Sequence, residues 1–161
     1  MKTISQFTRV AFLLVAAIAL PLLAAPKKSS AKSAPAEIFA HTLAKNTLAK
    51  HPDITGVEIS AEVDGACKTI ASTDVKEIGE KCDTDEIRPL RSGKEYVEHE
   101  KDGFDVSVPL RDSKGNVVAV VGMDIKPVPG QTKAQVLKLA RHIAEEMQSQ
   151  VPEKGKLFEK S

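Results

Sequence analysis

The segment Val117–Ile125 constrains the fold of this chain more than any other part of its sequence. It reads Val-Val-Ala-Val-Val-Gly-Met-Asp-Ile, so apolar residues are almost continuous along it. A strand buried on both faces has this composition. We therefore expect Val117–Ile125 to be a central strand of a sheet. Asp124, its one charged residue, is expected in water at the strand end rather than facing a pocket as an acceptor for an amine.

The rest of the sheet is predicted from residues that alternate between apolar and polar, which is typical of half-buried strands. Turn-forming residues, Asp64-Gly65 and Asp102-Gly103, divide these strands into hairpins. The four predicted strands are Val57–Val63, Lys68–Ser72, Glu95–Glu100 and Phe104–Leu110.

Two helices are predicted to flank this sheet. Apolar residues three and four positions apart place one over Ala36–Lys50 and another after Thr132, where Gln135 completes a capping box. Five antiparallel strands with the helices on one side give an α+β fold. Residues 151–161 are expected to form a frayed tail.

The first 25 residues predict export. Lys2 and Arg9 precede an apolar run of about 16 residues that ends in small residues, which is the pattern of a Sec-type signal peptide. The run is shorter than the ~20 residues that span a bilayer, although an uncleaved anchor is the alternative. Residues 26–35 are expected to be a flexible linker. The single domain, residues 36–150, is therefore expected to be periplasmic in a bacterium, or secreted.

Cys67 and Cys82 are the two cysteines of the chain. In an oxidising compartment two such residues most often form a disulfide. The bond would pin the polar segment Thr73–Gly93 against the sheet. A metal site or a reactive thiol is the alternative, but no His lies next to either cysteine, so no metal site is expected.

Charge and motifs exclude several classes of function. Without Lys2 and Arg9 of the signal peptide, the net charge is −1, and the chain has one Tyr and no Trp. Such a surface does not favour nucleic acid as a partner. No Gly-x-Ser-x-Gly, His-Glu-x-x-His or phosphate-binding glycine loop occurs, so we expect neither an enzyme nor a cofactor.

The order of the segments resembles a single Cache domain, a PAS-like sensor domain of bacteria that lies outside the cytoplasm. The resemblance covers residues 36–126 and is carried by Thr55–Ser60, Thr69–Thr73, Glu77–Lys81 and Val108–Ile125. It implies a five-stranded antiparallel PAS/profilin-like sheet with long N-terminal and C-terminal helices. It also implies a pocket for a small metabolite between the sheet and Thr73–Gly93. Members usually continue into a membrane helix and an output module, which are not expected here.

Five residues are candidates for binding the ligand of such a pocket. Arg88 and Arg91 could face the same way and hold a carboxylate, the alternative being a solvated turn. Ser72 and Thr73 end a strand where the pocket should begin, and either donate to a ligand or cap the next turn. Tyr96 is expected as a pocket wall or a core aromatic.

Two hypotheses of function follow from these observations. The first is an exported sensory module that binds a small carboxylate or amino-acid-like metabolite. The alternative is a ligand-free periplasmic interaction domain that forms a homodimer or docks on a membrane receptor. A pocket lined by the two arginines would favour the first, and an apolar patch on the first helix without a pocket would favour the second.

Overall fold

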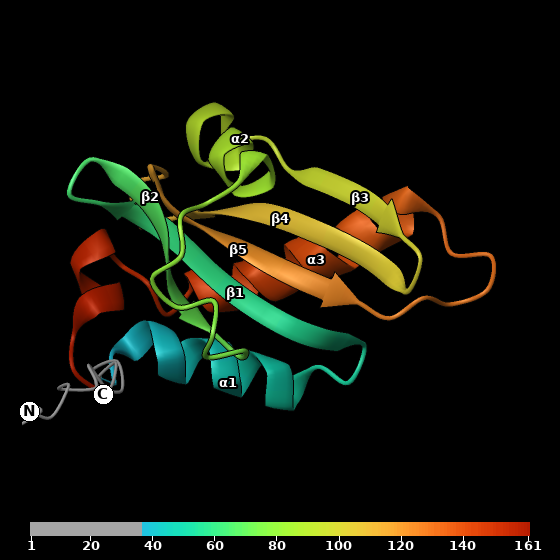
Figure 1. Ribbon diagram of the computed structural model, residues 1–161, viewed down its shortest axis with the longest axis horizontal. Coiled ribbons are helices and arrows are strands. Elements are labelled where there is room, and N and C mark those ends of the chain that lie inside the picture. The colour runs from blue at the N-terminus through green and yellow to red at the C-terminus, as the bar shows by residue number, and fades with distance from the viewer. Residues whose placement is uncertain (1–36) are drawn as a thin grey trace, which may run out of the picture. The chain divides into compact units, whose positions relative to one another are not determined.

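The structure, a computed structural model, describes residues 37–161, so the predicted signal peptide and the linker at 26–35 lie outside the described residues. Five antiparallel strands form one sheet in the order β2-β1-β5-β4-β3 (Figure 1). β5 is the middle strand, as its apolar sequence predicted. The strands are β1 Ile54–Val63, β2 Ala66–Ser72, β3 Tyr96–Glu100, β4 Gly103–Arg111 and β5 Val117–Ile125.

One face of the sheet is apolar and carries the hydrophobic core. It packs against α1 (Phe39–Lys50) and α3 (Lys133–Gln148), which contribute the fully buried side chains of Leu43 and Ile143. The α+β fold with a five-stranded antiparallel sheet is therefore confirmed. The two helices have 12 and 16 residues, which are ordinary lengths and not the long helices that were expected. No helix within residues 37–161 is long and apolar enough to cross a membrane.

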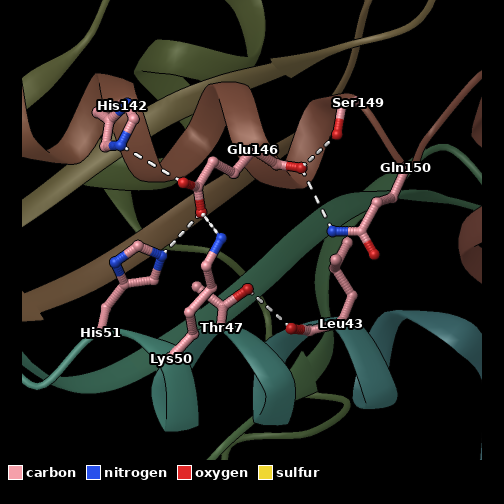
Figure 2. Close-up of polar contacts among 8 residues, drawn as sticks. All are labelled: Leu43, Thr47, Lys50, His51, His142, Glu146, Ser149 and Gln150. Atoms are coloured by element: carbon pink, nitrogen blue, oxygen red, sulfur yellow. Dashed lines mark hydrogen bonds and ion pairs between the residues drawn. The ribbon is translucent and has the colours of Figure 1, made fainter.

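Glu146 joins the end of α1 to α3 on this side of the sheet (Figure 2). Its Oε2 atom accepts a 2.7 Å hydrogen bond from Lys50 Nζ and lies 3.0 Å from His51 Nε2. Its Oε1 atom lies 3.4 Å from His142 Nε2. The bond from Lys50 holds the pKa of Glu146 below its usual value. The contacts fix the point at which the chain leaves α1 and enters β1.

The opposite face of the sheet carries polar side chains, and α2 (Thr84–Ser92) lies over it. The two predicted flanking helices, α1 and α3, do share one side of the sheet, whereas α2 forms within the polar segment Thr73–Gly93 and lies on the other. Alternation explains the polar character of this face, because Glu58 in β1 and Asp105 and Ser107 in β4 point away from α1 and α3. A short helix that buries only Pro89 completely can cover such a face.

The predicted bond between Cys67 and Cys82 is present, with Cα atoms 5.4 Å apart. It joins the start of β2 to the segment that precedes α2. Beyond it, Thr69 N donates to Glu80 O, and Gly79 N donates to Thr69 O. Residues 79–82 therefore run beside β2 and satisfy part of the outer edge of the sheet, which would otherwise be open to pairing.

The C-terminal residues are packed rather than frayed, so that prediction is wrong. A 3-10 helix at Lys154–Phe158 places Leu157 in the core with 0% exposure. Lys160 then forms an isolated bridge with Ile38 at the start of α1. One buried leucine and this bridge hold a segment whose composition is otherwise polar.

Candidate functional site

A pocket of about 470 Å³ lies over the polar face of the sheet, beneath α2 and the turns before it. β1, β4 and β5 supply its floor, and residues from Ser72 to Glu86 supply its wall. None of its lining residues is Lys, Arg or His. Eight of them carry carboxyl groups: Glu58, Asp74, Glu77, Asp83, Asp85, Glu86, Asp105 and Asp124.

The floor is part of two parallel rows of cross-strand neighbours, whose members on β3, Tyr96 and Glu98, lie outside the lining. The first row contains Glu58, Gly122, Ser107 and Tyr96. The second row contains Gly56, Asp124, Asp105 and Glu98. Residues paired in this way project on the same side of a sheet, so each row brings side chains from distant parts of the chain together.

The second row places Asp105 directly opposite Asp124. Asp105 is half-buried, and burial together with the charge of Asp124 raises its pKa to about 7. Asp124 is more exposed, but neighbouring protein removes part of its water and Glu58 adds a like charge, so its pKa is also raised. Like charges directly opposite each other destabilise a sheet. The arrangement therefore favours a bound cation or proton between the two strands.

Gly56 makes room for the carboxylate of Asp124. A Cβ atom at position 56 would overlap Asp124 Oδ2, whereas a Cβ atom at Gly122 would lie 3.7 Å from Glu58 Cβ, an ordinary contact. The missing side chain at position 56 is therefore required for the present position of Asp124.

Glu58 and Glu86 form a second carboxyl group pair, between β1 and α2. Ser60 Oγ and Thr69 Oγ1 donate to Glu58 Oε1 over 2.8 and 2.6 Å. Burial and a hydrogen bond with Glu58 raise the pKa of Glu86 to about 9. The raised pKa favours the protonated form of Glu86 at neutral pH.

The N-terminus of α2 is already occupied by carboxylates of its own chain. Asp83 Oδ1 accepts a hydrogen bond from Asp85 N, and Glu86 Oε2 accepts one from Asp83 N. Helix N-termini often bind anionic ligands through such backbone groups. Here the capping box uses them, so this helix end does not offer a site for an external anion.

Ser72 and Thr73 line the pocket, where the sequence placed them. Both hydroxyl groups bond to their own chain: Ser72 Oγ donates to Glu77 over 2.6 Å, and Thr73 Oγ1 accepts from Val57 N over 3.0 Å. This geometry matches the capping role that the sequence left open beside ligand contact.

The structure does not bring Arg88, Arg91 or Tyr96 into the pocket lining. The guanidinium of Arg88 lies 5.0 Å from the ring centroid of Tyr96, whose hydroxyl donates to Glu98 over 2.8 Å. Arg91 is exposed in the last turn of α2. The two arginines therefore do not converge on a shared carboxylate in this pocket.

Sequence reasoning missed Asp105, Ser107 and Glu58 as site residues. The available signal was their position, because each projects on the polar side of a strand whose other side is apolar. The polar side of such a strand usually faces solvent. Whether another element covers it is a matter of tertiary structure.

Metal binding finds no support in the described part of the chain, where no group of three or more His, Cys, Asp or Glu is arranged to hold a metal ion. The carboxyl groups belong to one pocket without forming a compact ligand set. The lining offers negative charge and hydrogen-bond acceptors.

Solved structures of low sequence identity share this architecture. The repressor BlcR of Agobacterium tumefaciens aligns with a TM-score of 0.51 and 11% identity, over 76% of this chain and 68% of that chain. A GAF sensor protein from Burkholderia vietnamiensis aligns with a TM-score of 0.50 and 11% identity, over 68% and 73% of the two chains. The fold is GAF- and PAS-like.

A type II free methionine-R-sulfoxide reductase from Thermoplasma acidophilum is also similar, with a TM-score of 0.47 and 18% identity, over 75% of this chain and 93% of that chain. Neither a protein-family model nor a curated protein matches the sequence. The expected resemblance to a Cache domain is thus supported only as a PAS-like fold, and membership of the Cache family is not shown.

Proposed function

We propose that this protein is an exported sensory module that binds a small organic cation in its acidic pocket. The observation that carries the proposal is the lining, with eight carboxyl groups and no basic side chain. Burial and mutual repulsion raise the pKa of several of these groups. A bound cation would relieve that repulsion, whereas a bound anion would add to it.

The ligand chemistry refines the expectation from the sequence. Of the two expected classes, an amino-acid-like metabolite carries an amine that suits this pocket, whereas a simple carboxylate would need Arg88 and Arg91, which lie outside the lining. We therefore propose that a protonated amine is the group recognised. An amino acid remains compatible if its carboxylate points toward solvent.

Two observations support a binding role outside the cytoplasm. The apolar N-terminal run suits a secretory signal, and the Cys67–Cys82 bond suits an oxidising compartment. The lining also contains no Cys, His or Lys, residues that often act as nucleophile or general base. We therefore propose binding without catalysis.

A thermal-shift screen of the purified protein tests the ligand class. Amines, amino acids and organic acids would be compared at equal concentration. A ligand present at about 100 times its Kd stabilises the folded state by about 2.7 kcal/mol. Stabilisation by cations alone supports the proposal. Stabilisation by organic acids alone contradicts it, and no stabilisation by any compound favours the ligand-free interaction domain.

Fractionation of cells that express the whole chain tests its location. N-terminal sequencing of the periplasmic protein should find a start near the end of the apolar run. Full-length protein confined to the cytoplasm would contradict export.

A further inference from the structure

We propose that Asp105, Asp124 and Ser107 form a subsite for a primary ammonium group. This inference rests on the proposed function, since it assigns the cation a place and a chemical class within the same pocket. The subsite lies on the floor, where β4 and β5 run side by side.

Ser107 provides evidence that is independent of the acidic residues. It lines the pocket and is 1% exposed, yet its hydroxyl makes no hydrogen bond with any other described residue. Buried hydroxyl groups in folded proteins nearly always have a partner. Because the Oγ atom of Ser107 is not sealed from solvent, it opens onto the pocket, where a ligand can supply the missing partner.

The carboxylates of Asp105 and Asp124 also lack a hydrogen-bond partner among the described residues. Neither side chain accepts a hydrogen bond from another described residue. Glu58 differs, because Ser60 and Thr69 both donate to it. Two open acceptors of the pocket therefore lie side by side on the floor, between β4 and β5.

Exposure increases along the subsite in the order Ser107, Asp105, Asp124, which are buried, half-buried and exposed, respectively. An ammonium group could thus enter past Asp124 and lose its water stepwise. Gly56 keeps this route open, because a side chain there would displace the carboxylate of Asp124.

The number and type of partners select a primary amine over a quaternary one. A primary ammonium has three N–H donors, and the subsite offers three side-chain acceptors. A quaternary ammonium has no donor and is usually bound by aromatic faces. No Phe, Tyr or Trp is among the residues that line this pocket.

Matched pairs of amines test the chemical class by calorimetric titration of the purified protein. The pairs are ethanolamine with choline, and 1-aminobutane with butyltrimethylammonium. We expect the primary member of at least one pair to bind about 10-fold or more tightly than its trimethylated partner. Equal or tighter binding of the quaternary members would overturn the subsite while leaving a cation-binding pocket. No binding of either member of either pair would overturn both proposals.

Substitutions test the location with the tightest-binding amine of that panel. Asp105→Asn, Asp124→Asn and Ser107→Ala should each weaken binding, the two Asp variants by about 10- to 100-fold. Glu98→Gln is the matched control, since Glu98 continues the same row but lies outside the pocket lining. It should leave the Kd unchanged. Loss of affinity in the control alone, or unchanged affinity in both Asp variants, would move the ammonium group elsewhere.

Discussion

Asp105 of β4 and Asp124 of β5 are direct cross-strand partners, and both carboxylates line the same pocket. A sheet optimised for stability alone would not pair two like charges in this way. Functional sites commonly break such local rules, and the rest of the fold compensates for the loss. Here the compensation includes the core between the sheet, α1 and α3, and the disulfide beside the pocket.

Removing one of the paired charges should stabilise the ligand-free protein. We expect Asp105→Asn to raise the free energy of unfolding by about 0.5–1 kcal/mol at about pH 8, because like charges opposite each other cost that much. Urea unfolding measures the change. Asp112→Asn is the control, because Asp112 accepts hydrogen bonds from Lys114 N and Asn116 N, and its loss should destabilise. Destabilisation by Asp105→Asn would mean that the carboxylate has a structural role.

The stability of the ligand-free protein should fall as pH rises from about 5 to 9. The folded-state pKa values of Asp105 and Glu86 are raised to about 7 and about 9, above the ordinary values of 3.8 and 4.5. The folded protein therefore holds protons that the unfolded chain has released, and this contribution is lost as pH rises through the folded pKa values.

Urea unfolding at several pH values measures this dependence. Asp105→Asn should flatten the fall between about pH 4 and 7, and Glu86→Gln should flatten it between about pH 4.5 and 9. Below about pH 4.5 a separate loss is expected, because the lowered pKa of Glu146 means that acid breaks its contact with Lys50. Stability that rises steadily from pH 5 to 9 would contradict the assignment of protonated carboxyl groups to the pocket.

Gly56→Ala should disturb the pocket, whereas Gly122→Ala should be tolerated by the fold. The new Cβ at position 56 must displace the carboxylate of Asp124, which is the far end of an exposed side chain, so we expect the pocket to change at a cost in stability of about 0.5 kcal/mol. The same addition at position 122 meets only an ordinary contact with Glu58. Unfolding experiments on both variants decide the matter, and a larger loss for Gly122→Ala would contradict the geometry.

The disulfide should hold the wall of the pocket in place. Replacing both Cys67 and Cys82 with Ser should lower stability by about 3 kcal/mol, which is the value for a loop of about 15 residues. Binding should weaken as well, because the bond anchors the segment that leads into Asp83 and α2. Thiol titration of the denatured, non-reduced protein should find no free thiol, and two free thiols would show that packing alone holds this segment.

Local signals in the sequence were sufficient for much of the fold. The apolar run of β5 identified the central strand, and the pair Thr132 and Gln135 marked the start of α3, where both capping-box hydrogen bonds are present. Cys67 and Cys82 were paired correctly because the chain offers no other cysteine. The residues that determine the strand and the helix start lie close together in sequence, and the two cysteines have no other partner with which to pair.

The site depended on contacts that local signals do not report. Asp105 and Ser107 lie on the polar side of β4, which the sequence alone indicates to be exposed to solvent. Only the tertiary structure shows that α2 covers it. Arg88 suggested an anion site, yet it packs on Tyr96, which the turn after α2 brings beneath it. Leu157 in the tail likewise reached the core only through the path of the chain after α3.

The most direct test of the account compares two five-carbon compounds of opposite charge, 1,5-diaminopentane and pentanedioate. Thermal unfolding of the purified protein would be followed with each compound at equal concentration and about pH 8. The acidic lining predicts that the diamine raises the melting temperature and that the dicarboxylate leaves it unchanged. A rise caused by pentanedioate, or no rise with the diamine at any concentration, would contradict a cation-binding pocket.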